Sequence, residues 1–74
     1  MSKLPDLPVR DVLKVLAAFG YHPDHQTGSH IICRHTETRR LVVLPADNPV
    51  AKGTLRAIIR EAGLTREQFL DGLS

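Results

Sequence analysis

The stretch that decides the fold runs over residues 28–35 and reads Gly28-Ser29-His30-Ile31-Ile32-Cys33-Arg34-His35. Its first two residues are typical of a turn, and the apolar, β-branched run that follows predicts a strand over residues 29–34. Successive side chains in a strand point to opposite faces, so Ile31 and Cys33 share one face, and His30, Ile32 and Arg34 share the other. The sequence therefore places a histidine, which titrates near neutral pH, at the start of a strand and on the same face as an arginine.

Upstream of this strand the sequence predicts a helix and then an edge strand. The helix has Pro8 in its first turn and runs to about Phe19, where Gly20 ends it, because apolar residues recur at helical spacing: Val9, Val12, Leu13 and Leu16. Residues 21–26 make a poor strand because Pro23 and Asp24 interrupt it, which suits the edge of a sheet.

Downstream, a polar turn over residues 36–38 leads into an apolar run at 40–44, which predicts the central strand of a small antiparallel sheet. Pro45 ends that strand, and a loop reaches to Lys52. A second helix is expected from near Gly53 to Gly63, with the buried stripe Leu55, Ile58, Ile59 and Ala62. Thr65 and Gln68 have the spacing of a capping box, so we expect a short third helix carrying Phe69, Leu70 and Leu73.

This order of elements predicts an α+β fold, a two-layer sandwich with helices on one face of a three-stranded antiparallel sheet and the other face open. The chain has 74 residues, which allows one domain over residues 1–74 that buries only about 60–65% of its unfolded surface.

Composition narrows the environment and the partners. The single cysteine, Cys33, excludes an internal disulfide framework, and no apolar stretch approaches the length of a membrane span or of a signal peptide's core. We therefore expect a soluble, unprocessed protein in the cytoplasm that does not contact a membrane. Net charge is only +2, but residues 25–60 hold six basic and two acidic residues. This local excess of positive charge suits binding to a phosphate backbone, or the charged side chains simply face water.

The four histidines do not form a metal-binding pattern. His22, His25, His30 and His35 are separated by three, five and five residues, which matches no zinc signature, and no acidic pair lies nearby in sequence. We therefore expect no metal and no other cofactor, and we treat His22, His25 and His35 as exposed polar residues.

The same residues suit a ribonuclease without a metal, because RNA supplies its own nucleophile in the 2′-hydroxyl next to the scissile phosphate. A neutral His30 can remove the proton of this 2′-hydroxyl as the oxygen attacks phosphorus, and Arg34, Lys52 or Arg56 can stabilise the charge on the phosphoryl oxygens. The expected product is a 2′,3′-cyclic phosphate. The sequence identifies no general acid for the leaving 5′ oxygen. Water, a lysine or the same histidine in a later step could serve.

The chain resembles the HicA family of mRNA interferase toxins. The likeness rests on Gly28-Ser29-His30, preceded by a helix ending in Ala18-Phe19-Gly20-Tyr21 and followed by a helix that reads Gly53-Thr54-Leu55-Arg56-Ala57-Ile58-Ile59-Arg60-Glu61-Ala62-Gly63-Leu64. The resemblance implies a fold like the double-stranded RNA-binding domain and a toxin that cleaves mRNA with His30 as its single catalytic histidine. It further implies inhibition by a HicB-like antitoxin that covers the open sheet face, with DNA contacted only through that antitoxin.

We accordingly predict RNA contacts at the basic residues around His30 and at its turn: Gly28, Ser29, Arg34, Arg40, Lys52, Arg56 and Arg60. Gly28 is expected to provide the backbone conformation of the turn. The Ser29 side chain is expected to hydrogen-bond either a phosphate or only the backbone of the turn. One departure from the family concerns the segment after the third strand, where many HicA-like chains carry a further histidine and this chain reads Pro45-Ala46-Asp47.

Two other functions remain open at this point. A double-stranded RNA-binding or regulatory module would use the same fold and basic patch without cleaving RNA. A DNA-binding helix-turn-helix around Gly63 is disfavoured, because Glu67 and Asp71 would face the phosphates with only Arg66 to compensate.

Overall fold

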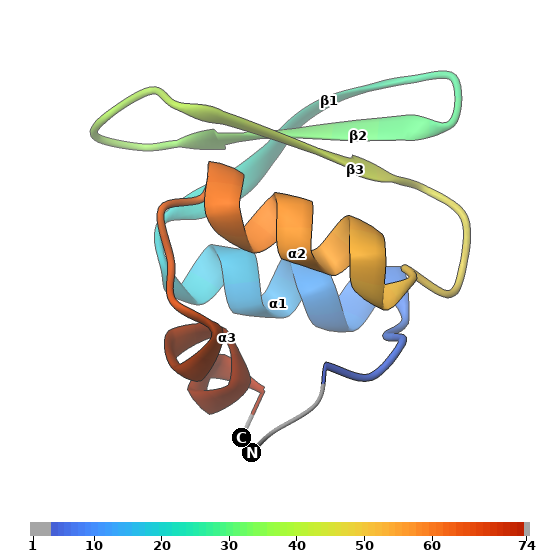
Figure 1. The fold of residues 1–74 in the computed structure, drawn as a ribbon. Coiled ribbons are helices and arrows are strands. Elements are labelled where there is room, and N and C mark those ends of the chain that lie inside the picture. Colours follow the sequence, from blue (N-terminus) through green and yellow to red (C-terminus); the bar gives the residue numbers. More distant parts are fainter. Residues whose placement is uncertain (1–3, 74) are drawn as a thin grey trace.

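Six elements follow one another in a computed structural model, which describes residues 4–73 (Figure 1). They are α1 (Val9–Ala18), β1 (Tyr21–Thr27), β2 (His30–His35), β3 (Leu41–Pro45), α2 (Lys52–Glu61) and α3 (Arg66–Gly72). The predicted α+β order is confirmed. Residues 1–3 and residue 74 of the predicted domain lie outside the described residues.

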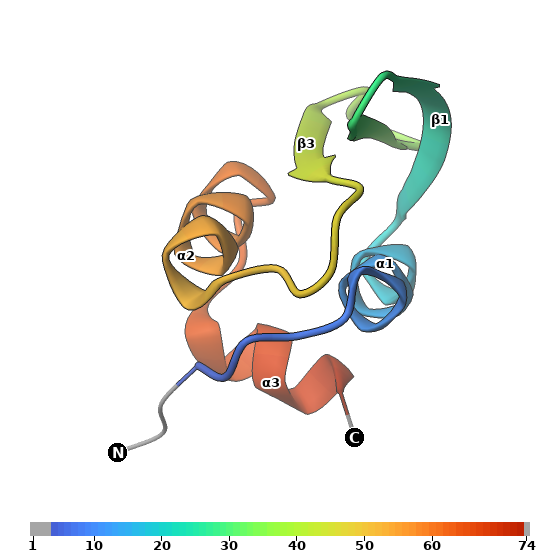
Figure 2. The same ribbon diagram turned by 90° about the vertical axis from the view of Figure 1, so that its right-hand side faces the viewer.

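The three strands form one antiparallel sheet in the order β1-β2-β3. All three helices lie on the same side of this sheet, with α1 and α2 beneath it and α3 farther away (Figures 1 and 2). The prediction that residues 40–44 form the central strand is wrong, because β2 lies in the middle and β3 at an edge. Val42 and Leu44 are fully buried against the helices, but Leu41 and Val43 are 48% and 43% exposed, so the apolar run does not reflect burial on both faces.

One core holds the two layers together. It gathers the inward faces of the helices, the inner face of the sheet and the segment before α1: Leu4, Leu7, Val9, Val12, Val15, Leu16, Tyr21, Cys33, Val42, Leu44, Val50, Leu55, Ile58, Ile59, Ala62 and Phe69. Cys33 is fully buried, and burial raises the pKa of its thiol. The Tyr21 hydroxyl donates to the carbonyl oxygen of Ala62 at 2.9 Å, which ties β1 to the end of α2.

The end of α2 and the start of α3 confirm the stop at Gly63 and the capping box at Thr65 that the sequence predicts. Gly63 has a positive φ of 74° after α2, and the amides of Gly63 and Leu64 close the helix on the carbonyl oxygens of Arg60 and Ile59. The capping box before α3 is present in both directions, since the Thr65 hydroxyl accepts from the Gln68 amide at 3.0 Å and Gln68 Oε1 accepts from the Thr65 amide at 2.8 Å.

The starts of α1 and α2 are capped from distant parts of the chain. Asn48 Oδ1 accepts from the Val9 amide at 2.6 Å, and Asp6 Oδ1 accepts from the Lys52 amide at 3.1 Å. A carboxylate of the protein itself therefore occupies the position at the start of α2 where an anion is favoured.

Gly20 links the end of α1 to β1 at a crowded point, and its replacement is expected to destabilise the domain. Its φ is 92°, and an added Cβ would lie 2.7 Å from Nε2 of His35. That ring cannot easily move, because its Nδ1 accepts from the amides of Glu37 and Thr38 at 3.1 Å each. We expect Gly20→Ala to cost about 1–3 kcal/mol in the free energy of unfolding, measured by urea denaturation.

Gly53→Ala is the matched control. Gly53 lies in α2, has no positive φ and has no atom within 4 Å of an added Cβ, so alanine should be neutral or stabilise the domain by up to about 1 kcal/mol. Equal urea midpoints of unfolding for Gly20→Ala and Gly53→Ala would show that neither the positive φ nor the contact with His35 makes alanine at residue 20 destabilising.

Candidate functional site

His30 is the first residue of β2 and lies on the open face of the sheet. Its pairing partners are Thr27 on β1 and Pro45 on β3, so its backbone is flanked by both neighbouring strands. Cys33 is fully buried on the helix side, and alternation along β2 therefore directs His30, Ile32 and Arg34 away from the helices. His30 is exposed, and its ring has no hydrogen-bond or ion-pair partner within residues 4–73.

The turn before His30 is held in place by two hydrogen bonds. The two-residue loop Gly28–Ser29 joins β1 to β2, and the φ of 53° at Gly28 is the feature for which type II′ hairpins place glycine first. The Gln26 side chain donates to the Gly28 carbonyl oxygen at 3.2 Å, and the Ala46 amide donates to the Ser29 carbonyl oxygen at 2.6 Å. These contacts fix the backbone from which the His30 ring projects.

A second polar group lies on the same open face. Asp24 Oδ2 contacts His25 Nδ1 at 2.9 Å and Arg34 Nη2 at 3.4 Å. These two partners, His25 first, hold the pKa of the exposed Asp24 carboxyl below its usual value. The register between β1 and β2 shifts between Pro23 and His25, so a β-bulge at Asp24 brings this carboxylate beside the next side chain.

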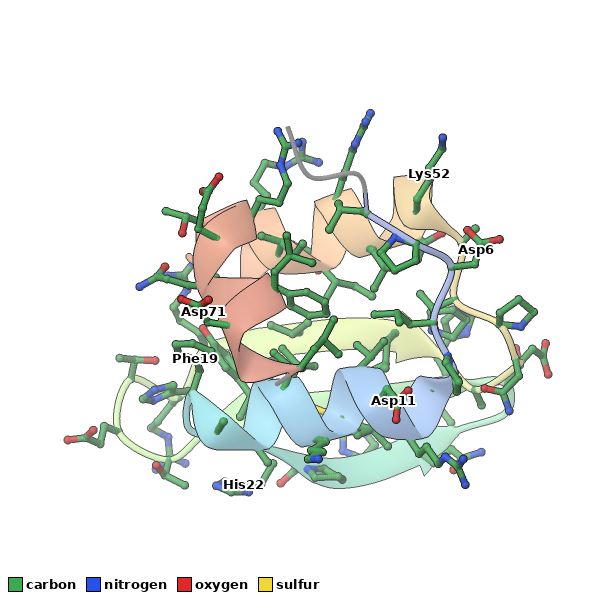
Figure 3. The ribbon with its side chains drawn as sticks, turned by 90° about the horizontal axis from the view of Figure 1, so that it is seen from below. Asp6, Asp11, Phe19, His22, Lys52 and Asp71 are labelled. Atoms are coloured by element: carbon green, nitrogen blue, oxygen red, sulfur yellow. The ribbon has the colours of Figure 1, made fainter. Side chains whose placement is uncertain are left out.

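The basic residues divide between the two layers. Arg34 is half-buried on the open face with His30, whereas Lys52, Arg56 and Arg60 are exposed on α2 in the helix layer. Figure 3 shows Lys52 beside Asp6 at the start of that helix. Arg40 is engaged structurally, because its guanidinium donates to the Glu61 carbonyl oxygen at 2.8 Å.

The other two histidines differ from each other. His22 is exposed on β1 opposite Arg34, as expected. His35 does not fit the expectation of an exposed residue, because it is half-buried, accepts two backbone hydrogen bonds and packs edge-on against Tyr21 with ring centroids 4.9 Å apart. Within residues 4–73, no three side chains of His, Cys, Asp or Glu come together as a metal site.

A family model described as "HicA toxin of bacterial toxin-antitoxin" matches residues 9–64, which is most of the 74-residue chain. The chain belongs to the HicA toxin family. No curated protein matches the sequence. The matched segment starts with α1 and ends just after α2, so it includes the whole sheet and the His30 turn, and α3 lies beyond it.

The loop after β3 is hydrogen-bonded to the turn before His30. Asp47 is exposed in the loop after β3, and the neighbouring Ala46 is bonded to Ser29. A side chain at residue 47 is thus near the turn that carries His30, and in this chain it is acidic.

None of the helices in residues 4–73 has the length and apolar character needed to cross a membrane.

Two features of this HicA site were missed from the sequence. His25 was treated as an exposed polar residue and Asp24 only as an interruption of the strand. Pro23-Asp24-His25 nevertheless carried a signal, because an interruption in a strand is where a bulge is expected. The cap that Asp6 places on α2 had no local signal, because the two residues are 46 positions apart.

Proposed function

We propose that this HicA-family chain is the toxin of a toxin–antitoxin pair and a metal-independent endoribonuclease that cleaves mRNA, with His30 as the catalytic base. The observation that carries the proposal is the His30 ring, which is exposed and without a protein partner on an open sheet face. A histidine that acts as a general base must be able to reach a ribose hydroxyl, and one of its own ring nitrogens must be free to accept the proton. Membership of the HicA toxins supports the same reading.

In the proposed reaction, the neutral His30 ring removes the proton of a 2′-hydroxyl while that oxygen attacks the adjacent phosphorus. The bond from phosphorus to the 5′ oxygen breaks, which leaves a 2′,3′-cyclic phosphate and a 5′-hydroxyl end. Of the cations predicted to contact RNA, Arg34 lies in β2 on the open face with His30, and in the proposed reaction it stabilises charge on the phosphoryl oxygens. The nucleophile belongs to the RNA, so the step needs no metal-activated water.

The test combines product chemistry with growth. Purified protein should cleave RNA in the presence of a chelator, and the fragments should carry cyclic phosphate and 5′-hydroxyl ends. Induced expression of the parent should arrest growth, while His30→Ala should not. Equal arrest by both proteins, or fragments with 5′-phosphate ends, would contradict the proposal.

We further propose that a HicB-like antitoxin covers the open face and blocks His30. This face carries the two large apolar side chains that are most exposed in residues 4–73, Leu41 and Val43, on the strand next to His30. Exposed apolar surface of this kind is typical of a partner-binding site. If the antitoxin acts here, co-expressing the protein encoded by the adjacent gene should restore growth.

A non-catalytic double-stranded RNA-binding module is the second candidate, and the cations on α2 favour it. Lys52, Arg56 and Arg60 follow one another at intervals of four residues on the exposed side of a helix and lie in the other layer from His30. On this hypothesis His30→Ala changes nothing. Arg56→Ala weakens RNA binding and reduces the slope of log Kd against log salt by about 1.

A further inference from the structure

The Asp24 and His25 pair supplies the group that the proposed cleavage lacks. We infer that His25, oriented by Asp24, is the general acid that protonates the leaving 5′ oxygen. This inference rests on the proposed ribonuclease function and adds a second catalytic side chain to His30. Asp24 is then a positioning residue, since it acts through His25.

The contact between the two side chains leaves the far nitrogen of His25 available. The exposed Asp24 carboxyl is ionised at neutral pH like any ordinary aspartate, so Asp24 accepts and His25 Nδ1 carries the hydrogen of the 2.9 Å contact. Nε2 then remains the acidic site, and the His25 side chain is 52% exposed. The Asp24 carboxylate offsets the charge of the imidazolium that forms when Nε2 takes up a proton, as in other carboxylate–histidine pairs.

Strand register places His25 and His30 on one face at a suitable spacing. His25 pairs with Ile32, and on that face of β2 the neighbours of Ile32 are His30 and Arg34. Diagonal neighbours of this kind are about 7–8 Å apart at their Cα atoms, a span across which two long side chains reach opposite sides of one phosphate. In-line attack and departure need the base and the acid on opposite sides.

The other histidines are poorer candidates for this role. His22 pairs with Arg34, four residues along β2 from His30, which is about 13 Å at the rise of a strand. His35 packs against Tyr21 and accepts two backbone hydrogen bonds. His25 alone combines an orienting carboxylate with a place beside His30, and Arg34 binds that same carboxylate at 3.4 Å.

Protons balance across the proposed step. His30 takes one proton from the 2′-hydroxyl, and Nε2 of His25 gives one to the 5′ oxygen as the bond to phosphorus breaks. The two rings leave the reaction with their protonation states exchanged. Exchange with water restores both, so no co-reactant is required.

The experiment compares two RNA substrates that differ only in the leaving atom. One is an oligoribonucleotide with its natural 5′ oxygen at the cleavage site, and the other has sulfur at that bridging position, which departs as a thiolate without needing a proton. We expect His25→Ala to lower kcat/KM on the natural substrate by about 10²–10⁴-fold and on the sulfur substrate by less than about 10-fold. Asp24→Asn should show a smaller loss with the same dependence on the leaving atom.

His22→Ala is the matched control, since it removes an exposed histidine from the same strand and face, and it should match the parent on both substrates. A loss with His25→Ala that is equal on the two substrates, or no loss, would overturn the inference while leaving the proposed function intact. His30→Ala should be slow on both substrates. If the parent fails to cleave, or His30→Ala cleaves as well as the parent, the proposed function and this inference are both overturned.

Discussion

Replacing His30 by alanine is expected to lower the rate of RNA cleavage by about 10²–10⁴-fold, the usual contribution of a general base. The ring is exposed and makes no hydrogen bond within residues 4–73, so its loss leaves no polar group unpaired. The midpoint of thermal unfolding and the Kd for uncleaved RNA should therefore stay close to the parent values. Single-turnover cleavage, thermal melting and a binding titration measure the three quantities.

Thr27→Ala provides the comparison, because Thr27 is exposed and is the pairing partner of His30 on β1. It should cleave at the parental rate. Added imidazole should restore part of the activity of His30→Ala, since a free base can enter the vacated space. Cleavage by His30→Ala at the parental rate, or a loss matched by a fall in thermal stability, would remove His30 from the chemistry.

The largest loss of stability is expected for Phe69→Ala. Phe69 is fully buried and belongs to the core, although α3 has only seven residues. Removing a buried phenylalanine ring typically costs about 3–5 kcal/mol, through lost burial and the cavity that remains. A domain of this size is stable by about 4–11 kcal/mol, so the change would remove a large share of that stability. Urea denaturation of the parent and the variant measures the difference.

The control lies on the same helix. Asp71 is exposed on α3 (Figure 3), and Asp71→Ala should change the free energy of unfolding by less than about 0.5 kcal/mol. Phe69→Leu retains much of the side-chain volume, so its loss in the free energy of unfolding should lie between those of Phe69→Ala and Asp71→Ala. A loss below about 1 kcal/mol for Phe69→Ala would mean that α3 contributes little to the core.

Local signals in the sequence were sufficient for most of the elements. Gly20 and Gly63 end helices because each adopts a positive φ, and Thr65 begins α3 through a capping box that needs only Gln68, three residues away. Alternation along residues 30–34 correctly separated the buried Cys33 from the exposed His30. The physical basis of these successes is that each depends on interactions between residues close together in the chain.

Strand order was not predictable in the same way. The apolar run of β3 suggested a central strand, but Leu41 and Val43 face outward on an edge strand. Hydrophobicity along one strand cannot distinguish burial between two layers from an exposed apolar surface, because that distinction depends on which other strands pair with it.

The sequence by itself determined the kinds of element, the glycine ends of α1 and α2 and the capping box of α3, since short-range sterics and hydrogen bonding fix these properties. Only the tertiary structure decided which side chains stand together. The pairing of β1 with β2 set His25 beside His30, the bulge turned Asp24 onto His25 and Arg34, and the folded chain brought Asp6 to the start of α2. Such contacts join residues that are distant in the chain or depend on cross-strand register, and they form only when the layers pack together.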